Sequence, residues 1–73
     1  MKAKIITLNT MHEALKVNSA AKKEPGRIAV MAGRYLINAK STLGMTAFDF
    51  PKEVKVIYPD NTANFEQYLE ENY

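Results

Sequence analysis

The stretch from Gly33 to Met45 most constrains the fold, because two kinds of side-chain periodicity meet within it. From Arg34 to Ala39 the side chains alternate as they do in a β-strand, and the alternation then stops. Ser41 is a residue type that caps helices, and Leu43 lies in the turn that follows it. We therefore predict a strand that leads directly into a short helix, from Ser41 to about Ala47. Such a junction places a hydroxyl beside free backbone N–H groups, which makes it a chemically usable position.

The other elements follow from capping, turn and alternation signals. Thr10-Met11-His12-Glu13 has the form of a capping box, in which the Thr10 hydroxyl accepts from the Glu13 N–H and the Glu13 side chain reaches back. Glu24-Pro25-Gly26 ends the helix that this box begins, and Ala32-Gly33 predicts a hairpin turn. The predicted strands are Lys2–Leu8, Arg27–Met31, Arg34–Ala39 and Glu53–Tyr58, and the predicted helices run from the Thr10 cap to about Lys23, from Ser41 to about Ala47 and from Ala63 to Glu71.

The order is thus strand, helix, strand, strand, helix, strand, helix, or βαββαβα. Four short strands cannot bury both of their faces alone, so the three helices are expected on one face of a single antiparallel sheet. The predicted fold class is α+β, an open-faced sandwich. A chain of 73 residues has room for one domain, which spans residues 1–73. Within it we expect Gly44 to mark close packing of the backbone against a neighbour, and Asn18 interrupts the apolar stripe of the first helix.

Composition excludes several classes of site. The chain has no cysteine, so disulfides and thiolate metal sites are excluded, and its single histidine, His12, argues against zinc. No His–carboxylate–Ser set is available for catalysis, so no enzyme, metal or cofactor is expected. No apolar run approaches the roughly 18 residues of a membrane span, and the first residues do not resemble a signal peptide. A cytoplasmic protein is the expectation.

Charge is unevenly distributed along the chain. Before Ser41 there are eight Lys/Arg and two Glu, and from Ser41 onward there are two Lys and six Asp/Glu, which gives balances of +6 and −4. A solvated surface is the simplest explanation of the basic half. Tyr35 is the only aromatic residue among these cations, so a stacking platform for nucleic acid is not indicated. A small domain that has this fold and binds protein or nucleic acid through its basic half remains an alternative.

The element order, together with the sequence Ala39-Lys40-Ser41-Thr42-Leu43-Gly44-Met45, resembles HPr, the small phosphocarrier protein of the bacterial sugar phosphotransferase system. The likeness continues into Phe50-Pro51-Lys52 and is specific from Ile28 to Lys52. The resemblance implies the HPr-like open-faced sandwich and two functional places. One is a histidine at the start of the first helix, which accepts a phosphoryl group from Enzyme I. The other is a serine capping the second helix, which HPr kinase phosphorylates so that the protein binds catabolite control protein A.

Of these two family positions, only the serine has a match at the corresponding place in this chain. Ser41 has the family's Ala-Lys-Ser context, whereas gapless counting back from Ile28 puts Thr10 at the histidine position and His12 at the position of the family's arginine. The resemblance therefore implies a non-enzymatic regulatory or adaptor protein of the phosphotransferase system, modified at Ser41. The alternative is a phosphocarrier that uses His12, assisted by the charge of Lys16. HPr kinase, catabolite control protein A and Enzyme I are the expected partners.

The partner surface implied by the resemblance lies around the second helix. Thr42 and Thr46 stand where large apolar residues are common in the family, so we expect a weaker or a different partner. The predicted partner-binding residues are Lys40, Thr42, Leu43, Met45 and Lys16.

Overall fold

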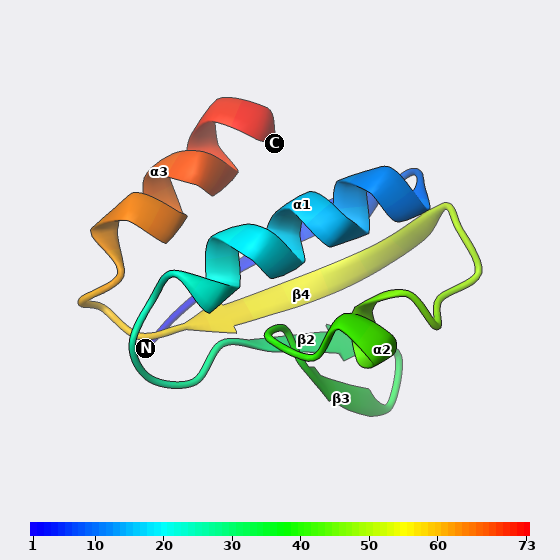
Figure 1. Ribbon diagram of the computed structural model, residues 1–73, viewed down its shortest axis with the longest axis horizontal. Helices are drawn as coiled ribbons and strands as arrows, with labels where there is room; N and C mark the ends of the chain where they lie inside the picture. Colours follow the sequence, from blue (N-terminus) through cyan, green and yellow to red (C-terminus); the bar gives the residue numbers. More distant parts are fainter.

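The computed structural model describes all 73 residues and has the predicted order βαββαβα (Figure 1). The predicted α+β class, with one four-stranded antiparallel sheet and three helices, is confirmed. None of the helices is long and apolar enough to cross a membrane. The elements are β1 (Lys2–Leu8), α1 (Met11–Lys22), β2 (Ala29–Ala32), β3 (Tyr35–Asn38), α2 (Thr42–Met45), β4 (Lys52–Tyr58) and α3 (Ala63–Asn72).

The sheet has the strand order β1-β4-β2-β3, so β4 lies between the first strand and the hairpin. β1 and β4 pair along their whole lengths, from Lys2 opposite Tyr58 to Leu8 opposite Lys52. β2 and β3 form the predicted hairpin, but its turn is Gly33-Arg34 and not the predicted Ala32-Gly33, because Ala32 still pairs with Tyr35. Gly33 takes a φ of 60° in the two-residue turn between them, a conformation that favours glycine. β1 and β3 are left as the two edges of the sheet.

The core lies between one face of the sheet and the helices. Alternate residues of the strands point into it, as β4 illustrates with Val54, Val56 and Tyr58 buried and Lys55 exposed between them. The helices cover this face, with α1 and α3 beside the long strands and α2 beside the hairpin (Figure 1). The buried apolar residues form one cluster: Ile6, Leu8, Ala14, Val17, Ala21, Ile28, Val30, Ala32, Ala39, Met45, Val54, Val56, Tyr58, Phe65 and Leu69.

Two details of the predicted helices differ from the structure. Thr10 caps α1 by accepting from the Glu13 N–H at 3.2 Å, but the Glu13 carboxylate does not reach back to Thr10 and instead accepts from the Tyr73 hydroxyl at 3.3 Å. The second helix has four residues, Thr42–Met45, and not the predicted seven. The Thr46 hydroxyl donates to the carbonyls of Thr42 and Leu43, at 3.0 and 3.1 Å, where the helix ends.

Candidate functional site

Ser41 is the N-cap of α2, as predicted. Its extended backbone, with φ −85° and ψ 110°, lets the side-chain oxygen accept from the Gly44 N–H at 3.2 Å. This hydrogen bond satisfies one of the backbone donors that the first turn of a helix leaves without a partner. Ser41 is half-buried, so the cap lies at the surface of the molecule and not in the core.

Gly44 lets this short helix approach the sheet closely. A Cβ atom at this position would lie only 2.8 Å from Cγ2 of Ile37 in β3. Any larger residue must displace either Ile37 or the helix, because carbon atoms in contact are normally 3.5–4.0 Å apart. The close approach predicted for Gly44 is therefore confirmed, and it fixes the depth at which α2 packs.

A chain of side-chain hydrogen bonds ties the start of α2 to the last turns of α1. Asn18 is buried, and its Nδ2 atom donates to the Ala39 carbonyl at 2.8 Å while its Oδ1 atom accepts from the Thr42 hydroxyl at 3.0 Å. The Lys22 ammonium donates to the same Thr42 hydroxyl at 2.7 Å. We call Asn18, Lys22, Ala39 and Thr42 the α1–α2 junction. It holds the capped turn against α1 by polar contacts.

The sequence prediction missed this junction. Asn18 was expected only as an imperfection in an apolar stripe, and Lys22 was not expected beside α2. The available signal was the amide itself, because a polar side chain on the buried face of a helix requires hydrogen-bond partners. The sequence did not show which backbone or side chain supplies them.

The predicted partner-binding residues lie in different environments. Leu43 is 84% exposed and Thr42 is exposed, whereas Lys40 is half-buried and its ammonium donates to the Glu24 carbonyl. Met45 is fully buried in the core, so its assignment to the partner surface is wrong. The reason is the helical period: Met45 follows Leu43 by two residues, about 200° around the helix, and so points to the opposite side.

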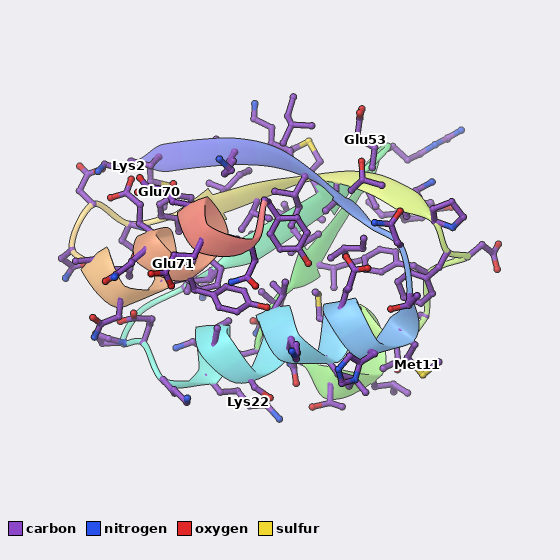
Figure 2. All side chains as sticks on the ribbon, turned by 90° about the horizontal axis from the view of Figure 1, so that it is seen from above. Lys2, Met11, Lys22, Glu53, Glu70 and Glu71 are labelled. Atoms are coloured by element: carbon purple, nitrogen blue, oxygen red, sulfur yellow. The ribbon has the colours of Figure 1, made fainter.

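His12 is exposed in the first turn of α1, and its side chain makes no hydrogen bond or ion pair within the chain. It lines a hollow of about 370 Å³ between α1 and α3, together with Lys16, Lys23 and Tyr68. Figure 2 shows Met11 and Lys22 at opposite ends of α1, so His12 and the α1–α2 junction lie toward different ends of this helix. The structure thus brings Lys16 beside His12 and does not join either of them to Ser41 by a contact.

Two tyrosines of the C-terminal segment remain protonated at neutral pH: Tyr68, which lines this hollow, and Tyr73, which follows α3. Burial, and secondarily the charge of Glu13, raises the pKa of Tyr68. Burial also raises the pKa of Tyr73, with further contributions from Tyr68 and Glu13 nearby. Both hydroxyls are therefore neutral, and the Tyr73 hydroxyl can serve as the donor to Glu13. Neither side chain is prepared for acid–base chemistry near neutrality.

No group of three or more histidine, cysteine or acidic residues is arranged to hold a metal ion. The two ion pairs are peripheral: Lys2 contacts Glu66 at 2.9 Å, and the Met1 amino group contacts Asp60 at 3.3 Å.

A comparison with models of known protein families finds none that matches this chain, and a comparison with curated proteins finds no match either.

Proposed function

We propose that this chain is a non-enzymatic, HPr-like regulatory or adaptor protein, which a partner recognises at α2 and which is modified on Ser41. The proposal rests on the resemblance carried by Ala39–Met45 and Phe50–Lys52 and on the observed element order. One observation carries it: Leu43 is 84% exposed in a turn that Ser41 caps and that the α1–α2 junction holds in place. A fixed, exposed leucine beside a modifiable hydroxyl is a suitable contact for a partner protein.

A phosphoryl group on Ser41 is compatible with the local structure. The Ser41 oxygen already accepts from the Gly44 N–H, and phosphoryl oxygens are stronger acceptors for the same backbone donors. Two cations belong to this region: Lys22 donates to the hydroxyl of Thr42, the residue after Ser41, and Lys40, the residue before Ser41, donates to the Glu24 carbonyl. The added charge would change the surface beside Leu43 while α2 stays folded.

Incubation with ATP and HPr kinase tests the modification. We expect the mass of one phosphoryl group to be added to the wild-type chain and to be absent from Ser41→Ala. Ser19→Ala is the matched control, because Ser19 is an exposed serine within α1 and should not affect labelling. Labelling that persists in Ser41→Ala, or no labelling of a folded wild-type chain, contradicts the proposed modification.

Binding to catabolite control protein A tests the adaptor role. The phosphorylated chain should bind in a calorimetric titration, and Leu43→Ala should weaken this binding about tenfold, which corresponds to about 1.4 kcal/mol. Ala47→Ser, at an exposed position just after α2, is the control and should bind like wild type. Equal binding by wild type and Leu43→Ala would remove α2 from the recognition surface.

A second candidate function is phosphoryl transfer through His12. The observation that favours it is the shared hollow, in which Lys16 and Lys23 supply positive charge beside an exposed imidazole near a helix N-terminus. Incubation with phosphoenolpyruvate and Enzyme I should then give an acid-labile label that His12→Ala abolishes and Lys16→Ala slows. If neither Ser41 nor His12 is labelled, a domain that has kept only the fold becomes the better proposal. A salt-dependent gel shift would then test nucleic acid as its ligand.

A further inference from the structure

The two edges of the sheet differ in how they are protected. β1 carries Lys2 and Lys4, and lysines along an edge discourage pairing with another chain. β3 reads Tyr-Leu-Ile-Asn and has no charged residue and no proline. Tyr35 and Leu36 are 68% and 66% exposed, so consecutive side chains of this edge meet solvent on opposite faces of the sheet. β3 is therefore the edge that is suited to accept another strand.

Apolar hollows lie beside β3 on both faces of the sheet. One, of about 400 Å³, is lined by Ala32, Tyr35, Ile37 and Phe48, on the face that the helices cover. The other, of about 430 Å³, is lined by Ala29 and Asn38, whose side chains belong to the open face, and by Arg27 and Ile28. Leu36 and Ile37 line both hollows. An added strand would direct successive side chains alternately to the two faces, so each hollow would receive every second residue.

The hairpin register leaves backbone groups free along this edge. Ala32 pairs with Tyr35 across a two-residue turn, and the Ala39 N–H donates to the Ile28 carbonyl at 2.9 Å. Because hydrogen-bonded positions alternate along an antiparallel pair, the backbone groups of Leu36 and Asn38 point away from β2. The Asn38 carbonyl accepts from the Ser41 N–H at 2.9 Å. The N–H and C=O of Leu36 and the N–H of Asn38 remain for an incoming strand.

Charge indicates what kind of strand fits. Arg27 lines one hollow, Lys52 lines the other, and Arg34 directly precedes β3, whereas Asp49 is the only acidic residue among the lining residues. None of these three cations takes part in an ion pair within the chain. A second copy is disfavoured, because it would bring the same three cations to this edge and only its Asp49 as a carboxylate among the lining residues.

We propose that β3 binds an extended, acidic peptide segment of a partner protein, which adds a fifth strand to the sheet between the two apolar hollows. The segment would be apolar at alternate positions and would carry carboxylates at its ends, opposite Arg27, Arg34 and Lys52. This surface contains neither Ser41 nor His12, so the inference does not depend on the function proposed above.

The probe is an acetylated synthetic peptide, Glu-Val-Thr-Val-Thr-Val-Glu, titrated into the ¹⁵N-labelled full chain. The largest amide shift changes should occur at Leu36 and Asn38, with a dissociation constant of about 0.1–1 mM, as is typical of a small interface. The same peptide with lysine in place of glutamate should bind at least about tenfold more weakly. Raising the salt concentration should weaken the first peptide selectively.

Matched variants locate the site. Leu36→Glu should weaken binding of the glutamate peptide about tenfold. Ile5→Glu, at a residue 64% exposed on the opposite edge strand, should leave binding within about twofold of wild type. Arg34→Glu repeats the test outside the strand, in case Leu36→Glu does not fold.

Four results would overturn the proposal. They are no binding by the glutamate peptide, equal binding by both peptides, shift changes centred on β1, and a wild-type dimer in sedimentation that Leu36→Glu dissociates. The last result would assign this edge to a second copy of the chain.

Discussion

The hydroxyl of Thr42 donates to Oδ1 of Asn18 at 3.0 Å, and this contact joins the start of α2 to the buried face of α1. The same amide donates through Nδ2 to the Ala39 carbonyl. One asparagine therefore fixes both the end of the β3 segment and the beginning of the helix that follows it. The position of Ser41 between Ala39 and Thr42 depends on this side chain.

Asn18→Ala should destabilise the chain by about 1–3 kcal/mol, because it leaves the buried Ala39 carbonyl without its donor. Thr42→Val should cost about 0.5–1.5 kcal/mol. Urea unfolding of both single variants and the double variant measures their coupling, expected at about 0.5–1.5 kcal/mol. Strict additivity would show that the contact between the two side chains contributes nothing.

Ser41→Ala should lower the free energy of unfolding by about 1 kcal/mol through loss of the cap. Ser41→Asp should stay close to wild type, because a carboxylate also accepts from the Gly44 N–H and is favoured at a helix start. Thermal unfolding, monitored by circular dichroism, distinguishes the two variants. If Ser41→Asp is as unstable as Ser41→Ala, the turn does not tolerate a negative charge. That result would also count against phosphorylation of Ser41.

Gly44→Ala should destabilise the chain by about 1–3 kcal/mol, although alanine is ordinarily the better helix former. The reason is the 2.8 Å separation between a Cβ atom at this position and Cγ2 of Ile37. Ile37→Leu removes that branch. Gly44→Ala should therefore cost less in the Ile37→Leu background than it does in the wild-type chain. If Gly44→Ala is stabilising in a urea titration, α2 does not pack as closely as the structure shows.

Met45→Ala should cost about 2–5 kcal/mol, because it empties a position that is fully buried. Leu43→Ala, two residues earlier, should change the free energy of unfolding by no more than about 0.5 kcal/mol. Chemical denaturation of the pair tests their assignment to core and surface. Similar losses for both variants would mean that Leu43 is also packed.

Stability should fall as the pH rises above about 10. The Glu66 hydrogen bond and charge raise the pKa of Lys2 above 10.5, and burial raises those of Tyr58, Tyr68 and Tyr73 above 10.0. The folded state therefore holds these protons more tightly than the unfolded state does. Their contribution is complete below the unfolded pKa values and is lost as the pH rises through the folded ones.

Urea midpoints measured from about pH 8 to about pH 12 test this trend. Tyr73→Phe should give a flatter alkaline decline than wild type, because it removes a hydroxyl whose pKa burial raises. An unchanged slope in Tyr73→Phe would show that its hydroxyl titrates equally in both states.

The element order, the hairpin, the Thr10 and Ser41 caps and the inward face of β4 were all predictable, because each depends on residues close together in the sequence. The length of α2 was not, since the Thr46 side-chain bonds that accompany its end have no strong local signal. The burial of Met45 followed from the helical period but was overlooked, because the family resemblance placed the whole helix on a partner surface.

The α1–α2 junction could not be predicted from the sequence at all. It requires knowing that the last turns of α1 pass beside Thr42, and this depends on how both helices pack against the sheet. The same holds for Glu13, whose capping-box partner was replaced by a tyrosine 60 residues away. Polar side chains with several possible partners are settled by tertiary packing and not by local preference.

The position of β4 between β1 and β2 also bears on how the chain acquires its structure during synthesis. β1 and β2 do not pair with each other, and β4, which lies between them, pairs with both. A nascent chain that ends before Lys52 contains β1, α1, β2 and β3, but its first strand has no strand to pair with. Such sequence-distant pairing is slow compared with local contacts. The sheet must therefore assemble late, because the pairing of β4 with both β1 and β2 has to wait until Lys52–Tyr58 has been synthesised.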